Sequence, residues 1–273
     1  MTDSHTRAAV ILARGLGKRM RANDTGAALA ADQMKAADAG MKGMIPIGRP
    51  FLDYLVSALA DAGVERICLV IGPEHQAVVD HYTRASRPSR VSISFAIQEK
   101  PLGTADASLA AEKFCGNDSF IVINSDNYYP VPALAELAHT TPPAIAGFTR
   151  RALIEEGNVP PDRVTRFGAL TIDDEGYLVR IVPRHGDPVA TDNRDVYASM
   201  NCWLFDSRIF DACRRVTMSP RNELELPRAV QLAIDEMNVR VRVVKLDVAV
   251  LDMSSRGDIA SVEEKLKSVN VRL

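Results

Sequence analysis

Apolar segments and helical patterns alternate along the first half of the chain. Continuous apolar runs predict buried strands at 8–13, 67–72, 91–97 and 119–124. Between these runs, apolar residues at helical spacing predict helices over 50–62, 73–84 and 104–114. This alternation is typical of a parallel sheet that carries helices on both faces.

The loops after three of these strands hold most of the glycine-rich and polar segments. They span 13–19, 98–104 and 124–130. Ligands of open α/β sheets bind beyond the carboxyl ends of the strands. We therefore expect these three loops to converge on one edge of the sheet.

The second half has a different pattern. The runs 167–173 and 177–183 flank the turn Asp173–Gly176 and predict an antiparallel hairpin, followed by a strand over 196–206. Further predicted elements are polar loops at 157–166 and 184–195, and helices at 222–236 and 256–268. The alanine-rich segment 21–40 fits either a short helix or a lid.

Together these patterns predict an α/β fold of three layers. We expect a Rossmann-like, mostly parallel mixed sheet with helices on both faces and an antiparallel flap. The absence of a low-complexity linker favours a single domain over 1–273. Within it we expect a first half, about 1–130, and a second half, about 131–273.

The composition of the 273 residues is that of an ordinary globular protein, with 47% hydrophobic and 25% charged residues. A formal charge of −2 argues against a nucleic-acid-binding surface, so any anion must be held by a local cluster. The sequence shows no secretory signal and no membrane span. With four scattered cysteines, these features predict a cytoplasmic protein.

The segment Leu12–Met20 directly follows the first apolar run. Its glycines allow backbone N–H groups to approach an anion, and Lys18 and Arg19 add positive charge. It lacks the Gly-Lys-Ser/Thr of a Walker A loop, and Met20 stands where a Rossmann fingerprint needs its third glycine. The segment indicates a phosphate site, although an ordinary strand-to-helix turn remains the alternative.

The second polar segment is Gln98–Ala107. The side-chain amide of Gln98 can offer a donor and an acceptor side by side, which matches the imide edge of uracil or thymine. Gly103 would let a base or ribose lie close to the backbone. An ordinary β-to-α loop shaped by its proline and glycine is the alternative.

Two aspartates follow apolar runs. Asp126 comes after 119–124, and Asp252 ends the predicted strand 248–252. Mg²⁺ prefers one or two carboxylates together with phosphate oxygens, so the two aspartates form a candidate magnesium site. Each of them alone is more often a turn or helix-cap residue.

In combination, these segments resemble the sugar-1-phosphate nucleotidyltransferases, which include glucose-1-phosphate thymidylyltransferase and the UDP-sugar pyrophosphorylases. Five segments match in the family order over nearly the whole chain. Leu12–Met20 resembles the Gly-x-Gly-x-Arg-Met/Leu loop, and Lys42–Ile47 the following lysine segment. The other three are Gln98–Ala107, Ser125–Asn127 and Ser219–Leu226.

The resemblance implies roles for individual residues. The catalytic residues would be Arg19 at the β- and γ-phosphates, Lys42 at the α-phosphate, and Asp126. Asp126 and Asp252 would hold Mg²⁺. The nucleotide would contact Leu12, Ala13, Gly15, Gly17, Lys18, Gln98, Pro101, Gly103 and Thr104. The acceptor would contact Gly168, Arg184, Asn201 and Arg221.

The chain departs from the family pattern at five places, one of which is the link 21–40 between the glycine loop and Lys42, longer than usual. The Glu-Lys-Pro after the hairpin is replaced by Pro183-Arg184-His185, so a sugar-binding glutamate is missing. Trp203 stands at a family glycine, where it would fill part of the sugar pocket. Arg14 and Met41 replace a small residue and a proline. These departures affect the acceptor pocket more than the nucleotide site.

The implied reaction couples an NTP, with UTP or dTTP favoured, to a sugar 1-phosphate and releases pyrophosphate. Its partners would be these two substrates, with neither nucleic acid nor membrane, in a possible homo-oligomer. One alternative is a non-catalytic regulatory protein that binds nucleotide sugars. Another is a cytidylyl- or guanylyltransferase with a non-sugar phosphate acceptor.

Overall fold

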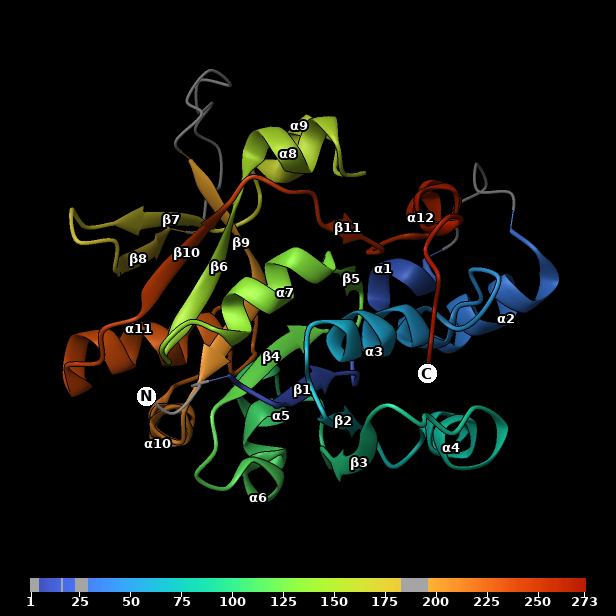
Figure 1. Ribbon diagram of the computed structural model, residues 1–273, viewed down its shortest axis with the longest axis horizontal. Helices are drawn as coiled ribbons and strands as arrows, with labels where there is room; N and C mark the ends of the chain where they lie inside the picture. The colour runs from blue at the N-terminus through green and yellow to red at the C-terminus, as the bar shows by residue number, and fades with distance from the viewer. Residues whose placement is uncertain (1–4, 16, 23–28, 183–195) are drawn as a thin grey trace.

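The computed structural model describes residues 5–15, 17–22, 29–182 and 196–273, and Lys18 by its backbone alone. A mixed sheet runs through the middle of the molecule in the order β10-β6-β9-β4-β1-β2-β3 (Figure 1). Its strands are β1 Ala8–Leu12, β2 Arg66–Ile71, β3 Ser92–Ile97, β4 Phe120–Asn124, β6 Ala144–Thr149, β9 Tyr197–Phe205 and β10 Arg242–Leu246. Strand β9 runs antiparallel to both of its neighbours, and the other pairings along this path are parallel.

Helices cover both faces of the sheet, which makes three layers (Figure 1). One face packs against α3 Phe51–Asp61, α7 Val131–Ala138 and α12 Ile259–Leu266. The other packs against α5 Thr104–Ala110, α10 Arg208–Arg215 and α11 Leu226–Met237. The remaining α-helices of the described chain are α1 Lys18–Arg21, α2 Ala31–Ala39, α4 Gln76–Asp80, α6 Glu112–Cys115, α8 Arg150–Glu155 and α9 Pro161–Val164.

Strand β1 shows why the sequence forms such a sheet. All five of its residues are buried, because side chains at alternate positions enter two different cores. Ala9 and Ile11 pack in the core under α3 and α7, whereas Val10 and Leu12 pack in the core under α5 and α11. A strand buried on both faces reads as a continuous apolar run, which is the pattern of 8–12.

The predicted α/β fold with its mostly parallel mixed sheet is confirmed. The hairpin also forms, as β7 Ala169–Ile172 and β8 Leu178–Val182, and Ala169 joins it to β9. Of the segment 21–40, residues Ala31–Ala39 form helix α2, and 23–28 lie outside the described residues. Among the described residues, no helix is long and apolar enough to span a bilayer.

Several element predictions were wrong. The predicted strand 248–252 is reduced to β11 Leu251–Asp252, which leaves the main sheet and pairs antiparallel with β5 Asn127–Tyr128. The helix predicted over 73–84 ends as α4 at Asp80, and a π-helical turn over His81–Ala85 follows. Helix α11 begins at Leu226 instead of 222, after the loop that reaches the cleft.

The single tryptophan of the chain, Trp203, lies in the core and is absent from the residues that line the cleft. Its side chain is fully buried, and its ring stacks on Phe205 with centroids 5.5 Å apart. The expectation that it fills part of the sugar pocket was wrong. Residue 203 pairs with Val122 of β4 inside the sheet, where a large apolar side chain packs against α5 and α10.

Replacing Trp203 by Ala should destabilise the protein by about 3–5 kcal/mol, because the change leaves a cavity in a closely packed core. Urea unfolding followed by far-UV circular dichroism measures this loss. A matched substitution, Val179→Ala on the exposed side of β8, should cost less than about 1 kcal/mol. Equal losses in the two variants would contradict the core position of Trp203.

Candidate active site

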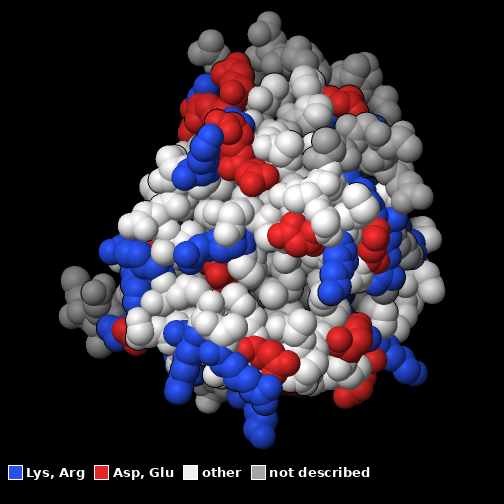
Figure 2. Space-filling model, turned by 90° about the vertical axis from the view of Figure 1, so that its right-hand side faces the viewer, with Lys and Arg blue, Asp and Glu red and all other residues white. Residues whose placement is uncertain are grey.

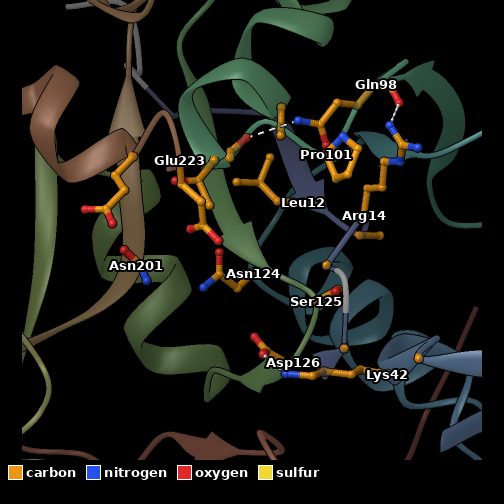
Figure 3. Close-up of a pocket in the computed structure, with 18 of the residues that line it drawn as sticks. Leu12, Arg14, Lys42, Gln98, Pro101, Asn124, Ser125, Asp126, Asn201 and Glu223 are labelled. Atoms are coloured by element: carbon orange, nitrogen blue, oxygen red, sulfur yellow. Dashed lines mark hydrogen bonds and ion pairs between the residues drawn. The ribbon is translucent and has the colours of Figure 1, made fainter. Parts of the chain in front are cut away.

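A cleft opens at the carboxyl ends of β1, β3 and β4, where the sheet topology brings three loops together (Figure 3). It encloses about 450 Å³. Its lining residues are Leu12, Ala13, Arg14, Gly15, Gly17, Arg19, Gly40, Lys42, Gln98, Pro101, Gly103, Thr104, Ala107, Asn124, Ser125, Asp126, Asn201, Arg221, Glu223, Glu225 and Pro227. The predicted convergence of the loops after β1, β3 and β4 is therefore observed.

Two of the described site candidates, Gly168 and Asp252, are not among the residues that line the cleft. The carbonyl oxygen of Gly168 accepts a hydrogen bond from the Ser199 amide (2.8 Å). Arg184 is outside the described residues, and the side chain of Lys18 is not described. Asp252 is buried next to the cleft, in contact with Asn127.

Two glycines bring the start of the chain to the cleft. Gly17 has φ +58, and a Cβ on it would lie 2.7 Å from both Cα and O of Gly40. Gly40 has φ +72 and ends α2. Only glycine tolerates both the positive φ and this backbone approach. The contact places the turn Lys42–Met44, which follows directly, beside the glycine loop.

The C-terminal part of the chain fastens this region from outside. The buried guanidinium of Arg256 donates to the carbonyl oxygen of Met20 (2.8 Å) and to the carboxylate of Asp38 (2.5 Å). One side chain therefore holds the end of α1 and the end of α2 together. Charge-assisted bonds of this kind are stronger than neutral ones, particularly when buried.

Lys42 and Asp126 form an ion pair in the cleft. Nζ of Lys42 donates to Oδ2 of Asp126 at 2.8 Å, and the two side chains are 12% and 22% exposed (Figure 3). The residues are 84 positions apart in the sequence, so the fold alone brings them together. The pair places one cation and one anion next to the glycine loop.

Asp252 is held beside Asp126 by the pairing of β5 with β11. Asp252 lies opposite Asn127, and the Met253 amide donates to the carbonyl oxygen of Asp126 (2.8 Å). Oδ1 of Asp252 accepts hydrogen bonds from Asn127 (3.1 Å) and Ser254 (2.8 Å). Oδ2 has no hydrogen-bond partner among the described residues and lies 3.5 Å from the Arg163 guanidinium.

Burial strongly affects the Asp252 carboxyl group. Loss of solvent raises its pKa to about 6, the negative charge of Asp126 adds to the increase, and Arg163 opposes it. Among the described residues, no group of three or more His, Cys, Asp or Glu side chains is placed to hold a metal. Two carboxylates with a free buried oxygen suit a hard divalent cation that takes its other ligands from phosphate.

Hydrogen bonds within the protein occupy part of the side-chain amide of Gln98. Its Nε2 donates to the carbonyl oxygen of Gly103 (3.1 Å) and to Oδ2 of Asp106 (2.7 Å), which uses both amide hydrogens. The opposite amide orientation would place Oε1 against two acceptors. Gln98 therefore retains only Oε1 for a ligand, whereas the sequence suggested a donor and an acceptor.

The loop before α11 packs against the loop after β3. Gly103 has φ +126, and a Cβ on it would lie 2.5 Å from the carbonyl oxygen of Leu224. The Leu224 amide donates to Leu102 (2.7 Å), and the Leu226 amide donates to the Thr104 hydroxyl (2.8 Å). Residues from the two halves of the chain therefore share one wall of the cleft.

Side chains of the second half complete this wall. Asn201 lies in β9 with φ +55, near an irregularity in the pairing with β6. Arg221 is 65% exposed, with Nε 3.9 Å from the Glu225 carboxylate. Glu223 also lines the cleft (Figure 3), and no role for it or Glu225 was predicted. The only feature of the sequence that could have indicated these two glutamates is their place in the family-like segment 219–226.

The surface charge agrees with a local anion site. Figure 2 shows basic and acidic side chains interspersed over one face of the molecule. This mixture matches the formal charge of −2. Among the described residues, the cations gathered at the cleft are Arg14, Arg19, Lys42 and Arg221.

Comparisons with known proteins place the chain among its relatives. It is 27% identical over 262 residues to UTP–glucose-1-phosphate uridylyltransferase AglF of Haloferax volcanii, covering 95% of this chain and 96% of that protein. It is 28% identical over 231 residues to the glucose-1-phosphate thymidylyltransferase of Streptomyces griseus, covering 83% of this chain and 57% of that protein. The chain also spans 57% of the Haloferax volcanii low-salt glycan biosynthesis nucleotidyltransferase Agl11, at 25% identity, with 83% of this chain covered.

A solved structure shows the same fold. A UDP-glucose pyrophosphorylase complexed with UDP-glucose superposes with a TM-score of 0.74 at 17% identity, covering 97% of this chain and all of the other. The family model described as nucleotidyl transferase matches residues 8–267, which include every segment that forms the cleft. The chain belongs to the nucleotidyl transferase family.

Proposed function

We propose that the protein transfers a nucleotidyl group from an NTP to a sugar 1-phosphate and releases pyrophosphate. The observation that carries this proposal is the Lys42–Asp126 pair next to the glycine loop, with the buried carboxylate of Asp252 beside it. Relatives that act on glucose 1-phosphate support it. The division into a nucleotide-binding half, about 1–130, and an acceptor-binding half, about 131–273, is part of the same proposal.

The chemistry needs positioning more than acid–base catalysis. An oxygen of the sugar phosphate forms a bond to the α-phosphorus, and the bond from that phosphorus to the α–β bridging oxygen breaks. The electron pair leaves with pyrophosphate. A phosphate monoester is already anionic at neutral pH, so no general base is required. The protein must align two polyanions and offset their repulsion.

The residues of the glycine loop would bind the triphosphate. Backbone N–H groups around Gly15 and Gly17 would face the phosphates, and Arg19 and Lys18 would supply positive charge. Lys42 would contact the α-phosphate, where negative charge develops during transfer. Its ammonium group already lies in the cleft, held by Asp126.

Asp126 and Asp252 are the residues that would hold Mg²⁺. The fit rests on Oδ2 of Asp252, a buried oxygen without a hydrogen-bond partner beside the Asp126 carboxylate. When bound, the cation would offset negative charge on the phosphate oxygens. Asn127 and Ser254 hold the other oxygen of Asp252 and so fix the direction of the carboxylate.

We propose UTP or dTTP as the favoured nucleotide. Oε1 of Gln98 can accept the N3–H of uracil or thymine, whereas N3 of cytosine is itself an acceptor. Leu12, Ala13, Pro101 and Thr104 line the same end of the cleft, and Gly103 allows close backbone approach. This arrangement supports uracil or thymine over cytosine without an additional donor from Gln98.

The acceptor would lie against the second half of the chain. Arg221 and Arg184 would bind the phosphate of the acceptor, and Asn201 and Gly168 would lie near the sugar. Glu223 can accept hydrogen bonds from sugar hydroxyls, which would compensate for the missing glutamate at 183–185. A cytoplasmic location and a homo-oligomer complete the proposal.

A pyrophosphate-release assay tests this function. The purified protein is incubated with Mg²⁺ and each common NTP, in combination with a panel of sugar 1-phosphates. We expect pyrophosphate to be released only when one sugar 1-phosphate is present together with UTP or dTTP. Selective UTP binding without release for any sugar would instead favour a nucleotide-sugar-binding protein, and the transferase proposal would fail.

Lys42→Met and Asp126→Asn should each lower turnover by at least about a hundredfold, because each removes a charge placed at the reacting phosphates. Their melting temperatures should stay within a few degrees of the wild type. Lys267→Met and Asp118→Asn, which change exposed residues outside the cleft, are the matched controls. Wild-type turnover in either cleft variant would refute the assignment.

The buried Asp252 should make stability depend on pH when no metal is present. Its raised pKa means that the folded state binds a proton more tightly than the unfolded state, so stability is lost as pH rises through about 6. Asp252→Asn removes this loss. In EDTA, the free energy of unfolding of Asp252→Asn, relative to that of the wild type, should therefore rise by up to about 3 kcal/mol between pH 4 and 8.

Urea unfolding at several pH values measures this difference. Asp118→Asn, which changes an exposed carboxylate, should show no such increase relative to the wild type. If the free energies of unfolding of Asp252→Asn and the wild type differed by the same amount at every pH, this result would contradict the raised pKa of Asp252.

A further inference from the structure

Arg14 is a departure from the family pattern to which the proposed chemistry assigns no role. Its guanidinium makes three contacts that join separate segments of the chain. Nε and Nη2 donate to the two carboxylate oxygens of Glu74, each at 3.2 Å, and Nη1 donates to the backbone carbonyl oxygen of Gln98 (Figure 3). Its side chain is only 10% exposed.

These contacts link the ends of three parallel strands. Arg14 follows β1, Glu74 lies between β2 and α4, and Gln98 follows β3. Arginine suits this position because its planar group can bind a carboxylate with two nitrogens and still donate from the third. Lysine could not make all three contacts with one fixed geometry.

The fold leaves space for the ion pair at Gly72. A Cβ on Gly72 would lie 2.4 Å from Nε of Arg14 and from both carboxylate oxygens of Glu74. The φ of Gly72 lies outside the left-handed region, so its backbone conformation does not itself require glycine. Residue 72 is glycine because the Arg14–Glu74 ion pair occupies the space that a Cβ would need.

The Gly72 loop is itself held in position. The Gly72 amide donates to Nδ1 of His75 (3.3 Å), and burial lowers the pKa of His75, which favours the neutral ring that this contact needs. Nε2 of His75 lies 3.7 Å from the Glu74 carboxylate. His75 and Arg14 therefore both lie near Oε1 of Glu74, whose side chain is half exposed.

Gln98 is the end point of this arrangement. Its amide N–H donates to Ile71 (2.9 Å), its carbonyl oxygen accepts from Arg14, and its side chain is held by Gly103 and Asp106. The position of Oε1 therefore depends on each of these contacts. The contacts of Arg14 given by the structure do not include Lys42, Asp126 or Arg19.

We propose that the Arg14–Glu74 pair is a positioning device for Gln98 and thereby sets the preference for the nucleobase. The inference rests on the proposed function, because it takes this end of the cleft as the base site. The ligand class is a nucleotide whose base offers a ring N3–H to Oε1, as uracil and thymine do and cytosine does not. Arg14 acts through Gln98 and need not touch the base.

Two variants break the pair in different ways. Arg14→Met removes the cation, whereas Gly72→Ala keeps both charges and fills the space that they occupy. Arg7→Met is the matched control, because Arg7 pairs with Glu65 (2.9 Å) at the opposite ends of the same two strands. Circular dichroism and melting temperature establish that each variant is folded, and Gly72→Ala keeps the test decisive if Arg14→Met does not fold.

Calorimetric titration with UTP, CTP and inorganic tripolyphosphate separates base recognition from phosphate binding. In the wild type and Arg7→Met, UTP should bind more tightly than CTP. In Arg14→Met and Gly72→Ala, the dissociation constant for UTP should rise about tenfold, with CTP changing less. Tripolyphosphate should bind all four proteins with the same affinity within about twofold.

Three results would overturn the inference. The first is a ratio of the UTP and CTP dissociation constants that is the same in both variants as in the wild type. The second is a loss of affinity for tripolyphosphate as large as the loss for UTP. The third is a wild type that binds UTP no more tightly than CTP. Failure of the proposed function is a separate result. A wild type that binds UTP selectively but releases no pyrophosphate with any sugar phosphate would reject the transferase and leave the role of Arg14 supported.

Discussion

The close approach of Gly17 to Gly40 is the constraint on which the cleft depends. Two backbones meet where no Cβ fits, so the glycine loop and the end of α2 lie in contact. Lys42 comes two residues after Gly40 and therefore reaches Asp126 at the end of β4. Arg256 holds the same contact from outside through Met20 and Asp38. A single steric condition thus positions the glycine loop and Lys42 together.

Electrostatics then determine what this geometry is suited to bind. Two buried or half-buried carboxylates lie close enough for one to raise the pKa of the other, and Lys42 and Arg163 each stand beside one of them. Such a site is costly for the free protein, since carboxylates lose solvent without gaining full compensation. The cost is characteristic of binding sites, where perturbed groups gather in a cleft. The proposed binding of a cation and phosphates would offset this cost.

Much of the arrangement could be predicted from the sequence, because strand order and loop position follow from hydrophobic patterns. Leu12, Gln98 and Asp126 were expected at one sheet edge, and they are found there. The strands β6 and β10 were missed because Gly147 interrupts one run and charged residues interrupt the other. Asp252 was expected at the end of a long strand, whereas a two-residue pairing with β5 places it. Such pairing depends on distant residues and has no local signal.

The β5–β11 pairing also has a consequence for how the molecule is made. Asn127 and Asp252 are 125 residues apart, and Arg256 bonds to a residue 236 positions before it. Contacts of such large sequence separation form late, because long loops must close first. A chain emerging from the ribosome can build β1 to β4 and their helices while the carboxylate pair is still incomplete. The nascent protein would therefore form the strand ends that carry Leu12, Gln98 and Asp126 before Asp126 and Asp252 meet, and the cleft would be completed only when residues of the second half pack against them.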